Sequence, residues 1–217
     1  MRARTAGVVV TTGLLMVTVW GTIVSAAGFA PQQREETCFG EEPRKVGGPS
    51  ETIIGTEGDD VILGGGRVEG LAGDDLICDA AYVIAGPGDD RIRTLDGGTA
   101  RGNGGDDELV SIAVSETASG PTLIGGPGDD VFWGGPEGEI VYGGSGRDSA
   151  RTGGGDDEVY LGAGKDAGYG GPGDDLFNGG NGRDHLDGGT GDDTVDGGNG
   201  SDRCRAVESR TSCARVP

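Results

Sequence analysis

The sequence is poor in basic residues and has a single histidine. Its 217 residues include 17 Lys and Arg against 37 Asp and Glu, which gives a formal net charge of −20 at pH 7. So acidic a chain repels phosphate backbones, which argues against nucleic acid as a partner. The one histidine, His185, leaves a Ser-His-Asp triad and an HExxH metalloprotease site without support.

Aromatic residues are also scarce, at 5% of the chain, whereas glycine supplies 49 positions. A chain of this composition buries little apolar surface and, without a ligand, lies near the disordered class. We therefore expect a bound ligand to contribute to the folding free energy, because it must offset the cost of ordering glycine-rich turns.

Long apolar runs are confined to the N-terminus. Residues 1–26 have the pattern of a signal peptide, in which Arg2 and Arg4 precede an apolar stretch and Val24-Ser25-Ala26 offers a cleavage site. A permanent membrane anchor is the alternative, but the 18-residue run from 7 to 24 is at the lower limit for spanning and contains four threonines. We predict a secreted, extracellular protein with a net charge of −22 after cleavage and no stable membrane insertion.

Cysteine is rare but even in number, which favours disulfides in an exported protein. Three pairings are possible, and neighbourhood in the sequence favours Cys38 with Cys78 and Cys204 with Cys213. No CxxC spacing is present, so metal binding by these cysteines is less well supported than disulfide formation. Residues 27–51 are expected to form an N-terminal linker or cap, and residues 206–217 a C-terminal cap.

Residues 125–205 read without interruption as nine nonapeptides: GGPGDDVFW, GGPEGEIVY, GGSGRDSAR, TGGGDDEVY, LGAGKDAGY, GGPGDDLFN, GGNGRDHLD, GGTGDDTVD and GGNGSDRCR. Their shared pattern is GGxGxDxUx, with U usually apolar. Glycines at positions 1, 2 and 4 allow the positive φ angles of a tight turn, and positions 7 to 9 alternate as in a short strand. Two units then form one flattened coil of eighteen residues, and the coils must stack to bury a core.

Stacked turns place the position-6 aspartates in columns, about 4.8 Å apart along the sheet. Carboxylates at that spacing repel, and a hard cation that accepts carboxylate and carbonyl oxygens, Ca²⁺, would relieve the repulsion. The GGxGxDxUx units resemble the calcium-binding nonapeptide repeats of RTX (repeats-in-toxin) proteins. The resemblance implies an all-β parallel β-roll, or β-solenoid, with several Ca²⁺ ions between successive turns; we expect about nine coils, disulfide-capped at both ends.

The position-6 aspartates of the regular block divide between two edges. The expected ligands are Asp130, Asp148, Asp166, Asp184 and Asp202 on one edge, and Asp157, Asp175 and Asp193 on the other. The unit GGPEGEIVY should be defective, because Glu137 replaces a glycine and Glu139 is longer than aspartate. We predict no tightly held ion at Glu139. The inward positions are expected to be Phe132, Ala150, Gly168, Leu186 and Cys204 on one face, and Val141, Val159, Phe177 and Val195 on the other.

Irregular coils are predicted from 52 to 124, where the same turn recurs at uneven spacing. The further ligands expected there are Asp60, Asp75, Asp90 and Asp107, at intervals of 15, 15 and 17 residues, and then 23 to Asp130. Each coil would have a calcium-type turn on one edge and an ordinary turn of variable length on the other. Residues 111–120 are predicted to be an inserted loop.

Eight Asp-Asp pairs recur at the same turn position, which favours metal binding over catalysis, since an active site needs one differentiated pair. Outward rows of Tyr142 with Tyr160, and of Trp133, Arg151 and Tyr169, either stabilise neighbouring strands or bind sugars. We predict a non-enzymatic calcium-binding protein with a structural or adhesive role and an unknown glycan or cell-surface partner. The alternative is a carbohydrate-active enzyme or an accessory module of an exported enzyme.

Overall fold

The computed structural model describes most of the chain after residue 36. The residues described are 10–11, 14–15, 18–19, 22–23, 37–112, 120–205, 209–211 and 213–215. They contain no helix, and therefore none long and apolar enough to cross a membrane. The chain divides into two units, Met1–Glu35 and Glu36–Pro217.

The first unit contains two short antiparallel pairs. These are β1 (Val10–Thr11) with β2 (Leu14–Leu15), and β3 (Thr18–Val19) with β4 (Thr22–Ile23). The remaining residues of the predicted signal, 1–26, lie outside the described part of the chain, so the signal stays a prediction.

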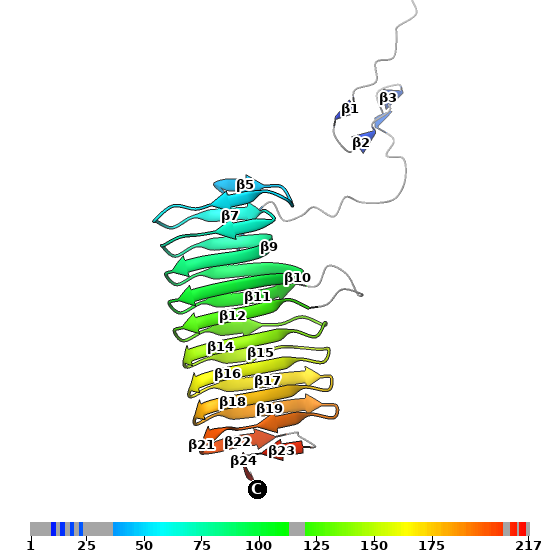
Figure 1. Cartoon of the computed structure of the whole chain (residues 1–217). Helices are drawn as coiled ribbons and strands as arrows, with labels where there is room; N and C mark the ends of the chain where they lie inside the picture. Colours follow the sequence, from blue (N-terminus) through cyan, green and yellow to red (C-terminus); the bar gives the residue numbers. More distant parts are fainter. Residues whose placement is uncertain are drawn as a thin grey trace, which may run out of the picture. The chain divides into compact units, whose positions relative to one another are not determined.

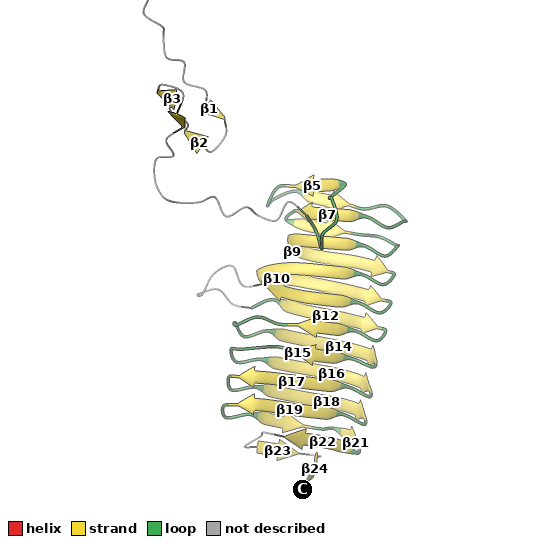
Figure 2. Ribbon diagram, turned by 180° about the vertical axis from the view of Figure 1, so that it is seen from behind, coloured by secondary structure: helices red, strands yellow, loops and turns green. Residues whose placement is uncertain are grey.

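The second unit is a parallel β-solenoid of about eight turns, close to the number expected (Figure 1). Each coil contributes a strand to each of two faces, and the strands of one face pair in parallel with those of the next coil (Figure 2). The first face consists of β5 (Lys45–Gly47), β7 (Val61–Gly64), the first half of β9 (Leu76–Pro87), the first half of β10 (Arg91–Gly104), β11 (Glu108–Ile112), β13 (Val131–Trp133), β15 (Ser149–Arg151), β17 (Ala167–Pro172), β19 (His185–Thr190), β22 (Asp202–Arg205) and β24 (Cys213–Arg215).

The second face runs behind the first. It consists of β6 (Thr52–Ile54), β8 (Arg67–Glu69), the second halves of β9 and β10, β12 (Thr122–Pro127), β14 (Ile140–Gly146), β16 (Glu158–Gly164), β18 (Leu176–Gly182), β20 (Thr194–Asp196), β21 (Asn199–Gly200) and β23 (Ser209–Thr211). In the early coils β9 and β10 pass from one face to the other without a break, and register shifts on either side of Thr94 absorb the change of length.

The core is a single file of apolar side chains between the two faces. All nine predicted inward positions are buried, which confirms the two faces read from the repeat. Gly168 faces Phe177, and a Cβ on this glycine would lie 2.6 Å from Phe177 Cε1. The small residue is therefore required by the large one, because a core this thin has no room to shift.

Disulfides lie near both ends of the stack, with the predicted pairings. Cys38 bonds Cys78, 40 residues away, and Cys204 bonds Cys213. On the N-terminal side, Phe39 lies beneath the Arg91 guanidinium, 4.3 Å from it, so the segment before the first coil is held against the first face.

The predicted loop at 111–120 begins later than expected. Ser111 and Ile112 are the last residues of β11, and the buried Ser111 donates its hydroxyl to Glu139 Oε1. Residues 113–119 lie outside the described part of the chain.

Candidate metal centre

Aspartates of successive coils form one continuous column along an edge of the solenoid, which we call the first edge. In each coil the backbone N–H of the aspartate donates to Oδ1 of the aspartate in the next coil, over 2.8–3.0 Å. The column contains Asp60, Asp75, Asp90, Asp107, Asp130, Asp148, Asp166, Asp184 and Asp202. The predicted stacking of the irregular coils is therefore confirmed, and uneven spacing does not interrupt it.

A shorter column follows the opposite edge, the second edge. Glu139 N donates to Asp157 Oδ1 at 2.7 Å, and the same bond joins Asp157 to Asp175 and Asp175 to Asp193 at 3.0 Å. The structure thus brings together on two edges all twelve aspartates predicted from the sequence, and adds Glu139 at the N-terminal end of the second column.

The second oxygen of these carboxylates is buried, and in most of them it has no hydrogen-bond partner among the described residues. Oδ2 is in this state in Asp75, Asp90, Asp107, Asp130, Asp148, Asp157, Asp166, Asp175, Asp184 and Asp202, and so is Oε2 of Glu139. A buried polar atom without a partner costs about 1–3 kcal/mol, and more when it is charged. Because the same carboxylate oxygen is unpaired in so many coils, these oxygens indicate a common ligand.

Glycine at position 1, where a unit has it, makes room for that second oxygen. A Cβ on Gly143 would lie 2.5 Å from both Asp148 Oδ2 and the Leu161 carbonyl oxygen of the next coil. A Cβ on Gly170 would likewise clash with Asp175 Oδ2 and the Gly188 carbonyl oxygen. At Gly143 and Gly170 the unpartnered carboxylate oxygen therefore lies beside a backbone carbonyl oxygen of the following coil.

Burial and neighbouring carboxylates raise the pKa of these groups in the metal-free form. Desolvation is the larger cause, and it raises the pKa of Asp90 to about 8 and those of Asp107 and Asp148 to about 7. The pKa of Asp175 on the second edge rises to about 6 for the same reason. A cation between the coils would oppose both effects, because it favours the ionised carboxylate.

Asp60 and Glu139, at the N-terminal ends of the two columns, differ from the others. Although burial alone would raise the pKa of Asp60, hydrogen bonds from Thr56 and Lys45 hold it below its ordinary value. Glu139 Oε1 accepts hydrogen bonds from Gly135 N at 3.0 Å and Ser111 Oγ at 3.2 Å, and burial raises its pKa to about 8. The prediction that Glu139 holds no ion tightly remains a prediction.

The position-5 aspartates form an exposed ladder that the sequence did not reveal. Asp59 Oδ1 accepts from Asp74 N and Asp74 Oδ1 from Asp89 N, so these bonds run in the direction opposite to those of the buried column. Each Asp-Asp pair thus ties its turn to the coil on either side. The repeated Asp-Asp doublet is the sequence feature from which this ladder could have been predicted.

The donor set fits a hard cation. Among the described residues, no three His, Cys, Asp or Glu side chains converge, so an ion in a column would need backbone carbonyls as well as carboxylates. Ca²⁺ accepts six to eight such oxygens in flexible geometry, whereas Zn²⁺ prefers nitrogen and sulfur.

Comparison with known families agrees with this geometry. The RTX calcium-binding nonapeptide repeat matches the chain in four copies, at residues 48–66, 122–149, 133–167 and 169–204. A search among curated proteins found no match. Rolls of this repeat are typically non-catalytic, and repeats of this kind in a β-solenoid indicate a calcium-binding structural module. The solenoid thus contains RTX calcium-binding nonapeptide repeats, at residues 48–66 and, in three further copies, between 122 and 204.

Proposed function

We propose that this chain is an exported, non-enzymatic protein whose β-solenoid is held together by Ca²⁺ and serves a structural or adhesive role. The observation that carries the proposal is the pair of carboxylate columns, in which buried carboxylate oxygens have no hydrogen-bond partner among the described residues and, at sites such as Gly143 and Gly170, lie beside a backbone carbonyl. Two disulfides and the apolar N-terminal segment support export, and RTX repeat proteins are commonly secreted.

Calcium binding and folding would be one equilibrium in this protein. Without ions, each coil carries a buried carboxylate next to another, in a chain with a net charge of −20. An ion between coils removes that repulsion and adds a further bridge to the backbone hydrogen bonds that already join the coils. Because the metal-free site is unfavourable, the free energy of binding becomes free energy of folding.

We assign the ligands to both columns. On the first edge they are Asp75, Asp90, Asp107, Asp130, Asp148, Asp166, Asp184 and Asp202; on the second edge they are Asp157, Asp175 and Asp193. Each would supply one carboxylate oxygen, and backbone carbonyls of adjacent coils would complete the coordination.

The outward aromatic rows support a structural role more strongly than a sugar site. Tyr142 and Tyr160 stack with ring centroids 5.3 Å apart, and the Arg151 guanidinium lies between Trp133 and Tyr169, at 5.5 and 5.2 Å. These faces are therefore engaged with neighbouring strands. A surface hollow of about 440 Å³ beside Arg151, Tyr169 and Asp187 is the place where a glycan would bind.

Binding and turnover assays on a panel of polysaccharides test the hypothesis of a non-enzymatic, adhesive role. The calcium-loaded protein is incubated with polysaccharides, and both retention of the glycan and release of reducing ends are measured. Retention without turnover, lost in Tyr169→Ala and unchanged in Tyr142→Ala, would support adhesion at the hollow. Turnover of any polysaccharide would overturn the proposal in favour of a carbohydrate-active enzyme.

A further inference from the structure

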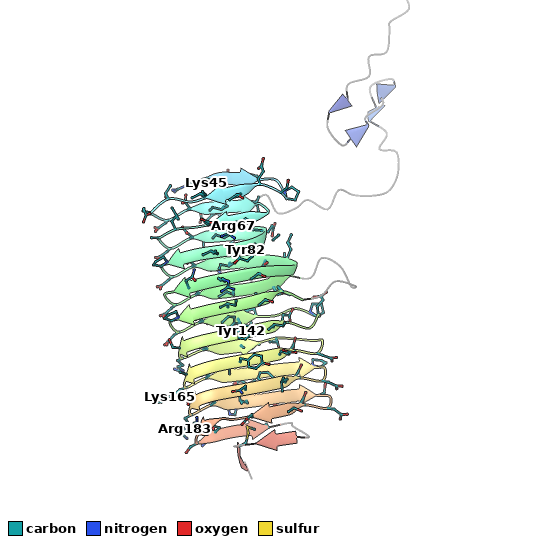
Figure 3. All side chains as sticks on the ribbon, viewed as in Figure 1. Lys45, Arg67, Tyr82, Tyr142, Lys165 and Arg183 are labelled. Atoms are coloured by element: carbon teal, nitrogen blue, oxygen red, sulfur yellow. A yellow bond between two sulfur atoms is a disulfide. The ribbon has the colours of Figure 1, made fainter. Side chains whose placement is uncertain are left out.

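Lys45 places a positive charge at the N-terminal end of the first column. It lies in β5, the first strand of the stack, where Figure 3 labels it. Its Nζ is 3.2 Å from Oδ1 and 3.3 Å from Oδ2 of Asp60, and 3.2 Å from the carbonyl oxygen of Ile54. The ammonium thus contacts one carboxylate and one backbone carbonyl, which are the donor types available to an ion elsewhere in the column.

The Oδ2 atom of Asp60 accepts hydrogen bonds, unlike Oδ2 of the other members of its column. Its Oδ2 accepts hydrogen bonds from Thr56 N at 2.5 Å and Thr56 Oγ1 at 3.0 Å, besides that from Lys45. In Asp75, the next member, Oδ2 is buried and has no hydrogen-bond partner in the part of the chain that the structure describes. Among the described residues Asp60 is the first member of its column, so it has a neighbouring aspartate of the column on one side only.

We propose that the Lys45 ammonium takes the place of a calcium ion at this end, so that the N-terminal coil, residues 45–60, folds without calcium. A covalently attached cation does not dissociate in low calcium, and its effective concentration at Asp60 is set by the chain. The Cys38–Cys78 disulfide fixes the segment before this coil to β9. The N-terminal coil then offers a preformed edge on which calcium-bound coils stack, and the ion array starts at Asp75 instead of Asp60.

The inference rests on the proposed calcium binding by the remaining coils, but its test does not. Hydrogen exchange is measured by mass spectrometry on the full, disulfide-intact protein, first in metal-free buffer and then with Ca²⁺. The variants are Lys45→Gln, Lys45→Arg as a charge-retaining rescue, and Lys165→Gln as the matched control. Lys45 and Lys165 are the only lysines, and Lys165 is an exposed residue labelled further along the stack in Figure 3.

In metal-free buffer we expect amides of residues 45–60 to exchange at least about tenfold more slowly than those of 125–205, because the half-buried Lys45–Asp60 ion pair stays in place when calcium is removed. Lys45→Gln should abolish that protection, whereas Lys45→Arg and Lys165→Gln should keep it. Added Ca²⁺ should restore protection of residues 45–60 in Lys45→Gln, since the vacated position can then take an ion.

Two results would overturn the inference: equal protection of 45–60 in Lys45→Gln and Lys165→Gln, or a wild-type N-terminal coil as unprotected as 125–205 in metal-free buffer. Failure of the proposed function has another signature, which is protection of residues 125–205 that does not change when Ca²⁺ is added.

Discussion

The first edge of the solenoid carries its acidic column from Asp60 to Asp202, whereas the second edge carries one only from Glu139 to Asp193. In the early coils the second edge is a continuous strand corner, with Ala80 and Thr94 buried where later coils have glycine-aspartate turns. Coils of 15, 17, 18 and 23 residues nevertheless stack in register on the first edge. One uniform edge is thus enough to set the stacking, and the other edge is free to vary in length.

The largest expected effect comes from filling the space beside a carboxylate. Gly143→Ala on the first edge and Gly170→Ala on the second should each destabilise the calcium-loaded protein by about 3 kcal/mol, because the new Cβ displaces a carboxylate and a carbonyl oxygen. Urea unfolding followed by circular dichroism measures the loss. Gly154→Ala is the matched control, since its Cβ would have no neighbour closer than 3.7 Å. Equal stability of all three variants would mean that the glycines do not make room for a site.

Neutralising one carboxylate should have opposite effects with and without calcium. In metal-free buffer at pH 8, Asp148→Asn should raise the unfolding free energy by about 1–3 kcal/mol, because it removes a buried negative charge. With saturating Ca²⁺ the same variant should be less stable than wild type, since it loses a ligand. Asp129→Asn, in the exposed ladder, should change either value by less than about 0.5 kcal/mol.

The two edges should also respond differently to such a change. Asp148→Asn interrupts the long column and should reduce the calcium-dependent protection from hydrogen exchange in the coils on both sides of its own. Asp175→Asn interrupts only the short column, so residues 60–107 should keep their wild-type hydrogen exchange. A loss of protection at 60–107 in Asp175→Asn would show that the edges are not independent.

Metal-free stability should fall as pH rises from about 4 to 8. The pKa values of Asp90, Asp107 and Asp148 are raised to about 8, 7 and 7 in the folded chain, from 3.8. Between these values the folded chain binds more protons than the unfolded chain, so raising the pH favours unfolding. The β-sheet signal in circular dichroism at pH 5 and pH 8, in buffer stripped of metal by a resin, measures the effect. Calcium affinity should rise over the same range, because ions displace protons; a larger metal-free β-sheet signal at pH 8 than at pH 5 would contradict both statements.

The smallest expected effect is at the N-terminal end of the second column. Glu139→Asp shortens the side chain and should let this turn bind an ion, adding about one Ca²⁺ to the stoichiometry measured by calorimetry. Glu139→Gln should leave the wild-type stoichiometry unchanged. A loss of one bound ion in Glu139→Gln would show that Glu139 is already a ligand.

The repeating parts of this structure and the disulfides near its ends could be predicted from the sequence, whereas the contacts at the N-terminal ends of the two columns could not. The nonapeptide period locates Phe132 and Phe177 in the core and Asp148 and Asp175 on opposite edges, because each turn is specified locally by its own glycines. Lys45 with Asp60 and Ser111 with Glu139 are single contacts between segments 15 and 28 residues apart, with no period to mark them. Such contacts depend on which coil lies at an end of a column, and that is decided only when the stack forms.

The central claim, that calcium and folding are one equilibrium, is tested most directly by circular dichroism of the disulfide-intact protein during a Ca²⁺ titration from a metal-free start. Extracellular calcium modules bind at about 10⁻⁴ to 10⁻³ M, which sets the range, and Mg²⁺ is the control. We predict a cooperative gain of β-sheet signal with Ca²⁺ and none with Mg²⁺. A protein already fully folded in metal-free buffer at pH 8, and unchanged by Ca²⁺, would contradict the account.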